Sequence, residues 1–231
     1  MSDSLWDQKR VDRYVKLYGD PREMAGSQAN LCRDVATLIT GTSILDVGCG
    51  IGHLIPFIEG RNYTGFDYSF AMLEKLTDFF PSIHVIQGDA TAPYKEFQNE
   101  MSYNILEPVE TAVSVSLIIH LPDLEGVKQL LVNMWNTATK EIIFGVETMG
   151  DNTVTRASGL TIRNIAVPHV IDLLGELDIP KRQVAWQHQQ MTYKNQTIVH
   201  PLKANPMAMT PPQLFQRTTL FHVFKEHVFK D

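Results

Sequence analysis

The chain has 231 residues, of which 44% are hydrophobic and 20% charged, a composition typical of a globular protein that buries one main core. Its formal net charge of −6 at pH 7 excludes an overall basic surface, so we expect no nucleic-acid partner. Its 2 cysteines are too few for a disulfide framework, and no stretch is long and apolar enough to cross a bilayer, so we expect no membrane partner and a cytoplasmic location.

The first 40 residues predict two helices ahead of the first strand. Residues 4–18 and 21–39 are joined at the tetrapeptide GDPR, where Pro21 suits a first helical turn. We therefore expect residues 1–40 to form an N-terminal helical cap and residues 41–231 to form the main domain.

From residue 43 onward, short apolar runs alternate with longer amphipathic segments, which predicts repeated strand–helix–strand units and a parallel sheet. The expected strands are 43–48, 63–67, 84–89, 111–117 and 141–147, and the expected helices are 53–58, 71–80, 124–137 and 167–177. The Gly, Asn, Asp and Thr content of the next segment, 148–159, predicts a loop. Two more strands, 182–191 and 218–226, flank a proline-rich insertion at roughly 191–216 that is too long for a tight hairpin.

Three glycines follow an acid where the first predicted strand ends. Asp46, Gly48, Gly50 and Gly52 form the pattern D-x-G-x-G-x-G. A dinucleotide fingerprint G-x-G-x-x-G starting at Gly48 needs another glycine where His53 stands. An acid placed two residues before the first glycine suits a ligand that carries an amine, not a pyrophosphate that seeks a helix N-terminus.

The segment ILDVGCGIGH resembles the first motif of the class I S-adenosylmethionine-dependent methyltransferases, and further matches follow in order. In YTGFDYS, Asp67 ends the second strand, where the family binds the ribose hydroxyls. In VIQGDA, Asp89 ends the third strand, where the family reads the adenine amino group, and Ala90 follows it. Tyr68 and Met72 fall where the family flanks the adenine ring.

The segment ETAVSVSLIIHLPD resembles the fourth strand of this family and the loop that follows it. Ser114, Ser116 and His120 fall where that strand meets the active site. We expect His120 to position the acceptor or act as a general base; the alternative is a ring that packs or caps the next helix. Ile119 stands where many relatives carry a second histidine, so family arguments from a histidine pair do not transfer.

The cap segment RYVKLYGDPRE resembles small-molecule members of the family. The resemblance implies that the cap folds over the cofactor with Tyr14, Tyr18 and Arg22 nearest to it. Arg22 could pair with the cofactor's carboxylate in a bidentate fork; the alternative is an amphipathic helix with a solvated arginine. The cofactor-binding residues expected from the chain are Asp46, Gly48, Gly50, Gly52, Asp67, Tyr68, Met72, Asp89, Ala90, Ser114, Ser116, Tyr18 and Arg22.

The resemblance implies an α/β, Rossmann-like fold with a seven-stranded, mostly parallel sheet flanked by helices. It further implies S-adenosylmethionine as cofactor, S-adenosylhomocysteine as product, and in-line methyl transfer to a nitrogen or oxygen of a small-molecule substrate. A protein or nucleic-acid methyltransferase is one alternative, which the absence of an Asn/Asp-Pro-Pro-aromatic motif disfavours. A catalytically silent binding subunit is the other. The histidine spacings in the tail match no metal motif, so we expect no metal.

Overall fold

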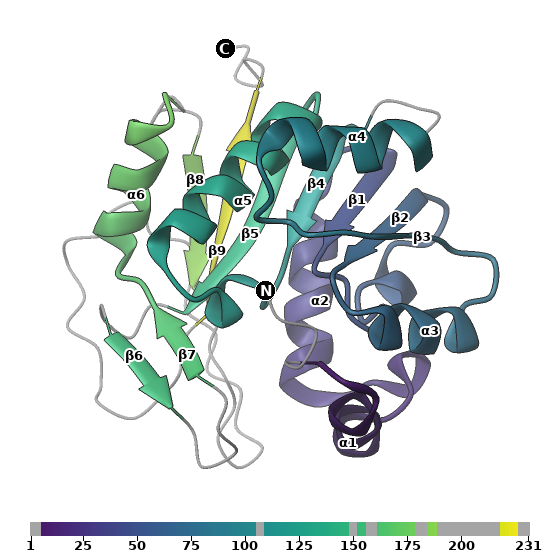
Figure 1. The fold of residues 1–231 in the computed structure, drawn as a ribbon. Coiled ribbons are helices and arrows are strands. Elements are labelled where there is room, and N and C mark those ends of the chain that lie inside the picture. Colours follow the sequence, from purple (N-terminus) through teal and green to yellow (C-terminus); the bar gives the residue numbers. More distant parts are fainter. Residues whose placement is uncertain are drawn as a thin grey trace.

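Parallel strands alternate with helices from residue 43 onward, as the sequence pattern predicts (Figure 1). The computed structural model describes residues 6–104, 109–147, 152–155, 161–178, 184–188 and 218–225. The strands of the main sheet are β1 (Ser43–Val47), β2 (Asn62–Asp67), β3 (His84–Gln87), β4 (Thr111–Ser114), β5 (Glu141–Glu147), β8 (Val184–His188) and β9 (Thr218–Phe224). Their order across the sheet is β3-β2-β1-β4-β5-β9-β8.

The direction of winding changes beside β1. The chain runs outward from β1 to β2 and β3, and then returns to place β4 and β5 on the other side of β1, with all of these neighbours parallel. Strand β9 is antiparallel to both β5 and β8. In a sheet of this kind the carboxyl ends of the two strands at the switch point border a crevice where ligands bind. The α/β Rossmann-like class with a mostly parallel sheet and flanking helices is therefore confirmed.

Helices cover both faces of the sheet. The helical elements are α1 (Gln8–Tyr18), η1 (Pro21–Glu23), α2 (Gly26–Leu38), η2 (Ile55–Phe57), α3 (Phe70–Phe79), α4 (Tyr94–Asn104), η3 (Ile118–His120), α5 (Leu124–Thr137) and α6 (Val167–Glu176), with η marking short 3₁₀ turns. Side chains from α4, α5 and α6 pack in one core cluster, whereas those from α2 and α3 pack in a second. None of the helices that the structure describes is long and apolar enough to cross a membrane.

Helix α1 does not join either of these two clusters. Its buried Val11 packs with Ile51 of the glycine loop and with Met72 of α3. This small third cluster holds the first helix at the carboxyl edge of the sheet, next to the crevice. Both expected cap helices are present, but the second begins at Gly26, because Pro21 starts the separate turn η1. The division into 1–40 and 41–231 stays a prediction.

A buried carboxylate ties the chain together at the opposite edge of the sheet. Glu141 is fully buried and accepts hydrogen bonds from Thr40 N (2.7 Å), Gly41 N (3.2 Å) and Thr111 Oγ1 (2.7 Å). Its other oxygen lies 2.7 Å from His222 Nε2. Burial alone would raise the pKa of Glu141, but these partners, His222 foremost, lower it to about 2. The carboxylate thus links the end of α2 to strands β4, β5 and β9.

Three local expectations are corrected. The helix expected at 53–58 is wrong, because Pro56 and the glycines on either side limit it to turns and the short η2. The loop expected at 148–159 is wrong in part: β6 (Asn152–Thr155) pairs antiparallel with β7 (Thr161–Asn164), and the β-branched residues of both strands favour extended backbone. Helix α4 was not predicted. The expected insertion at 191–216 lies outside the described residues.

Candidate cofactor and acceptor site

A cavity opens at the carboxyl ends of β1, β2 and β4, where the sheet changes its winding. Its lining comes from the glycine loop, the N-terminal segment, α3 and the loop after β4, and consists of Trp6, Tyr14, Gln28, Cys32, Asp46, Gly48, Cys49, Gly50, His53, Leu54, Phe66, Asp67, Tyr68, Ser69, Met72, Ala90, Val115, Ser116, Leu117 and His120. Segments more than 100 residues apart therefore meet in one site.

The glycine loop needs its glycines at two positions for different reasons. Gly48 has φ +79°, and a Cβ built on it would lie 2.9 Å from Leu117 Cβ, so a side chain there would clash with the loop after β4. Gly50 has φ +54° with open space beside it, and its N–H donates to Asp67 Oδ2 at 2.9 Å. The backbone can thus approach a ligand closely at Gly50.

The Asp67 carboxylate at the end of β2 is held in a fixed orientation. Ser69 N donates to Oδ1 at 2.9 Å, while Gly50 N donates to Oδ2. Burial raises the pKa of Asp67, and these backbone bonds oppose the rise. Each oxygen keeps a further lone pair, so the group can accept from two neighbouring hydroxyls.

Asp46 is more deeply buried, at 5% exposure, and lies in the same cavity. Tyr63 donates its hydroxyl to Asp46 Oδ2 at 2.8 Å. Burial, with the charge of Asp67 added, raises the pKa of Asp46 to about 7, although the Tyr63 bond lowers it. A cationic ligand group would stabilise the ionised form of Asp46, because it would bring an opposite charge to a poorly solvated carboxylate.

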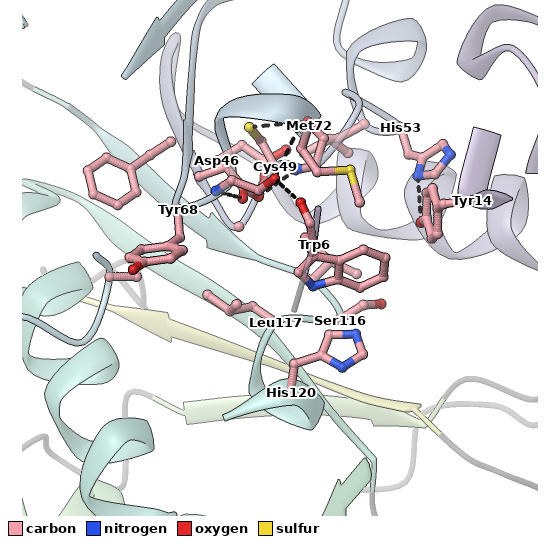
Figure 2. A pocket seen from close by; sticks show the side chains of 18 of the residues that line it. Trp6, Tyr14, Asp46, Cys49, His53, Tyr68, Met72, Ser116, Leu117 and His120 are labelled. Carbon is pink, nitrogen blue, oxygen red and sulfur yellow. Dashed lines mark hydrogen bonds between the residues drawn. The ribbon is translucent and has the colours of Figure 1, made fainter. Parts of the chain in front are cut away.

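The N-terminal segment forms the wall of the cavity that faces these acids. The Trp6 carbonyl accepts a 2.9 Å hydrogen bond from Ser69 Oγ, and the Trp6 ring packs edge-on against Tyr14 (5.5 Å) and His120 (5.6 Å). The Tyr14 hydroxyl lies 3.4 Å from His53 Nδ1. Figure 2 shows Trp6 and His120 on one side of the cavity, with Tyr14 and His53 at one end.

The end of β4 contributes a strained residue and the candidate base. Ser116 has φ +63°, a left-handed conformation that is uncommon for a residue other than glycine. Strain of this kind gathers at functional sites, and Ser116 lines the cavity. His120 ends η3 and lies beside Trp6 (Figure 2). Strand β7 packs against the same turn. The β6–β7 hairpin therefore supports the loop that carries His120.

The structure brings together most of the residues that the sequence predicts for the site. Those that line the cavity are Asp46, Gly48, Gly50, Asp67, Tyr68, Met72, Ala90, Ser116 and His120. Those that lie outside its lining are Gly52, Asp89, Ser114, Tyr18 and Arg22. The roles of all these residues toward a cofactor stay predictions.

Each residue outside the lining has a visible reason for its place. Arg22 forms an exposed ion pair with Asp20 and lies over the Phe79 ring, as in the solvated-arginine alternative. Ser114 is fully buried and donates to Val47 O at 2.9 Å, which joins β4 to β1.

The other three are likewise engaged elsewhere. Asp89 accepts from Thr91 N and Oγ1. Tyr18 is 44% exposed, and its ring packs at a tilt against Tyr14. A Cβ on Gly52 would clash with the Ile55 side chain, so close packing explains the glycine at this position.

Sequence reasoning missed several lining residues, above all Trp6, His53, Gln28 and Cys32. His53 stands directly after the last motif glycine, which is the one local signal that could have drawn attention to it. Trp6 carries no such signal, because only the fold brings it to His120. Among the residues that the structure describes, no group of three or more His, Cys, Asp or Glu side chains could hold a metal ion.

Comparison with known proteins agrees with this arrangement. Residues 45–126 match a family model described as a methyltransferase domain, a range that runs from β1 into α5. A search of curated proteins finds no match.

Solved structures share the fold over nearly the whole chain. A Synechocystis magnesium protoporphyrin IX methyltransferase with bound S-adenosylhomocysteine is 12% identical with a TM-score of 0.63, covering 97% of this chain and 98% of its own. A possible histamine N-methyltransferase from Thermotoga maritima is 14% identical with a TM-score of 0.62, covering 95% and 98%. A methyltransferase from Archaeoglobus fulgidus is 13% identical with a TM-score of 0.63, covering 93% and 99%. At sequence identities this low, the structural similarity shows that this chain shares the fold of these proteins.

Proposed function

We propose that this chain is a class I S-adenosylmethionine-dependent methyltransferase that transfers the methyl group to a nitrogen or oxygen atom of a small molecule; the match of residues 45–126 to a methyltransferase-domain model supports it. S-adenosylmethionine carries that methyl group on a sulfonium, which makes the carbon electrophilic. The protein therefore needs mainly to position an acceptor, exclude water and, where the acceptor bears a proton, remove it.

The observation that carries the proposal is the contact between Trp6 and His120. Trp6 belongs to the N-terminal segment, is tied to α3 through Ser69, and reaches the loop after β4 with its ring. This bridge closes one side of the cavity beside the candidate base. A site closed in this way suits an acceptor of metabolite size and keeps water from the transfer, whereas a polymer would need an open groove.

The cavity residues divide into two groups by position. Asp67 and Tyr68 lie with Ala90 at the ends of β2 and β3, where they would hold the adenosine half of the cofactor, and Asp46 would face its ammonium group. His120 lies on the other side, beside Trp6 (Figure 2). An imidazole there can orient an acceptor or take its proton, because its ordinary pKa lies near neutral pH.

The test is a panel assay on the purified chain with S-adenosylmethionine, in which release of S-adenosylhomocysteine is measured. The panel holds small amines, nitrogen heteroaromatics, phenols and alcohols, together with peptides and nucleic acids. We expect turnover with a small acceptor, a higher KM for S-adenosylmethionine in the Asp67→Ala variant, and at least about a hundredfold fall in kcat for His120→Ala, the usual range for loss of a general base.

Two outcomes would contradict the proposal. Turnover only with peptides or nucleic acids would replace the small-molecule assignment with a macromolecular one. Binding of the cofactor without transfer to any panel member or to fractionated cell extract would indicate a catalytically silent binding subunit.

A further inference from the structure

The part of the site that the structure describes offers no cation for the carboxylate of the cofactor. No lysine or arginine is among the residues that line the cavity. Arg22 is engaged by both oxygens of Asp20 on the surface. Among the described residues, the groups that could meet a carboxylate in this cavity are therefore neutral hydrogen-bond donors.

We infer that Tyr14, oriented by His53, donates its hydroxyl hydrogen to the carboxylate at the amino-acid end of the cofactor. The inference rests on the proposed function, since it takes S-adenosylmethionine to be the ligand. Tyr14 is the binding residue, and His53 is a positioning residue that acts through it.

The position of the pair within the cavity supports this assignment. Tyr68 lies at the opposite end of the cavity from Tyr14 and His53, and Asp46 lies between these ends (Figure 2). A cofactor with its adenosine beside Tyr68 extends across the glycine loop toward Tyr14. Its ammonium group would then meet Asp46, and its carboxylate would meet the Tyr14–His53 pair.

The hydrogen-bonding state of His53 decides which way the Tyr14 hydroxyl points. His53 is buried at 8% exposure, and burial lowers its pKa to about 4, so the ring is neutral at neutral pH. Its Nδ1 lies 3.4 Å from the Tyr14 hydroxyl, whereas its buried Nε2 has no hydrogen-bond partner among the described residues. One ring nitrogen of the neutral imidazole must carry the hydrogen, and the two tautomers differ in which buried group is left without a hydrogen bond.

If Tyr14 donated to Nδ1, the hydrogen of His53 would sit on Nε2 as a buried, unpaired N–H group. Orphaned buried N–H groups are rare, because they lose the full solvation of a donor. If instead Nδ1–H donates to the Tyr14 oxygen, Nε2 keeps only a bare lone pair. We therefore assign the hydrogen to Nδ1, which leaves the Tyr14 hydroxyl hydrogen available to a ligand.

The surroundings of Tyr14 fix its ring in place and keep its hydroxyl protonated. Its ring packs against Trp6 at 5.5 Å and Tyr18 at 4.5 Å, and Val11 anchors the same helix in the small third cluster. Burial, and after it the neighbouring Tyr18, raise the pKa of the Tyr14 phenol well above its ordinary value, so the hydroxyl stays protonated. A donor that is fixed before the ligand arrives loses little freedom on binding.

Calorimetry with three related ligands isolates the contribution of the cofactor's carboxylate to the binding free energy. S-adenosylhomocysteine carries both the ammonium and the carboxylate, 5′-(3-aminopropylthio)-5′-deoxyadenosine lacks only the carboxylate, and 5′-deoxy-5′-methylthioadenosine lacks both. We expect Tyr14→Phe to weaken S-adenosylhomocysteine about tenfold or more, as loss of a hydrogen bond to a charged group does, and to leave the other two ligands unchanged.

Two variants test the role of His53. Asparagine keeps an N–H donor near the place of Nδ1 and removes Nε2, whereas leucine removes both nitrogens. His53→Asn should therefore retain the preference for S-adenosylhomocysteine over the carboxylate-free ligand, and His53→Leu should lose it as Tyr14→Phe does. Thermal unfolding of each variant shows whether the fold is intact.

The control is Tyr94→Phe on α4, whose hydroxyl bonds to Asn136 O away from the cavity and whose loss should change no affinity. Equal weakening of all three ligands by Tyr14→Phe, or no weakening at all, would overturn the inference. Failure to find any methyl acceptor would overturn the proposed function alone, because these binding differences do not depend on turnover.

Discussion

Asp46 should make the stability of the cofactor-free protein fall as pH rises, and the Asp46→Asn variant should remove that effect. Burial raises the pKa of this carboxyl from 3.8 to about 7. A shift of about three pKa units corresponds to roughly 4 kcal/mol of stability at most. The native state favours the protonated carboxyl, so this stability is fully present below pH 4 and is lost as pH rises through about 7.

Two other buried groups act in the opposite direction and must be separated from Asp46. His53 has its pKa lowered to about 4, so its contribution is present above pH 6.5 and is lost as pH falls toward 4. Glu141, with a pKa lowered to about 2, loses its contribution as pH falls below 4.5. Both groups are shared by the wild type and the variant, so they cancel in the difference between the two proteins.

The assay is urea unfolding of both proteins between pH 4.5 and 8.5, with the free energy of unfolding extrapolated to water. Asparagine resembles the protonated carboxyl in shape and has no charge to bury. Relative to the wild type, Asp46→Asn should gain about 3 kcal/mol across this range, with most of the gain between pH 5 and 7. Parallel pH profiles for the two proteins would refute the reasoning, because they would mean that Asp46 ionises inside the fold at no cost.

Three further predictions concern Asp67, the glycine loop and the buried carboxylate of Glu141. Asp67→Ala should lower the affinity for S-adenosylhomocysteine by at least about tenfold in calorimetry, because it removes the acceptors that we propose for the ribose hydroxyls; an unchanged affinity would refute that role. Gly48→Ala should lower the free energy of unfolding by about 1–3 kcal/mol, because it combines a left-handed backbone with a Cβ 2.9 Å from Leu117; a variant as stable as the wild type would show that the loop adapts. Glu141→Ala should cost about 3 kcal/mol or more in urea unfolding, because it leaves several buried hydrogen-bond donors, among them Thr40 N and Gly41 N, without their acceptor, at roughly 1–3 kcal/mol each. The affinity of the folded protein for S-adenosylhomocysteine should not change, because its proposed site lies at the opposite edge of the sheet.

Sequence alone determined the features that depend on local pattern and spacing. Strand β5 and helix α5 were predicted with the bounds that the structure shows, Glu141–Glu147 and Leu124–Thr137. In α5 the signals are local, since Asp123 caps the helix by accepting from Gly126 N and the apolar residues recur at helical spacing. The acids and glycines at strand ends were equally readable, because parallel strands bring their carboxyl ends to one edge.

Tertiary structure alone decided the wall of the site that faces those acids. Trp6 reaches His120, and Tyr14 reaches His53, only because α1 folds back onto the glycine loop and α3 through Val11. The same folding leaves Arg22 on the surface, where it forms an ion pair with Asp20. Periodicity and motif spacing describe what neighbouring residues do, whereas these contacts join segments tens to more than 100 residues apart and depend on how whole elements pack.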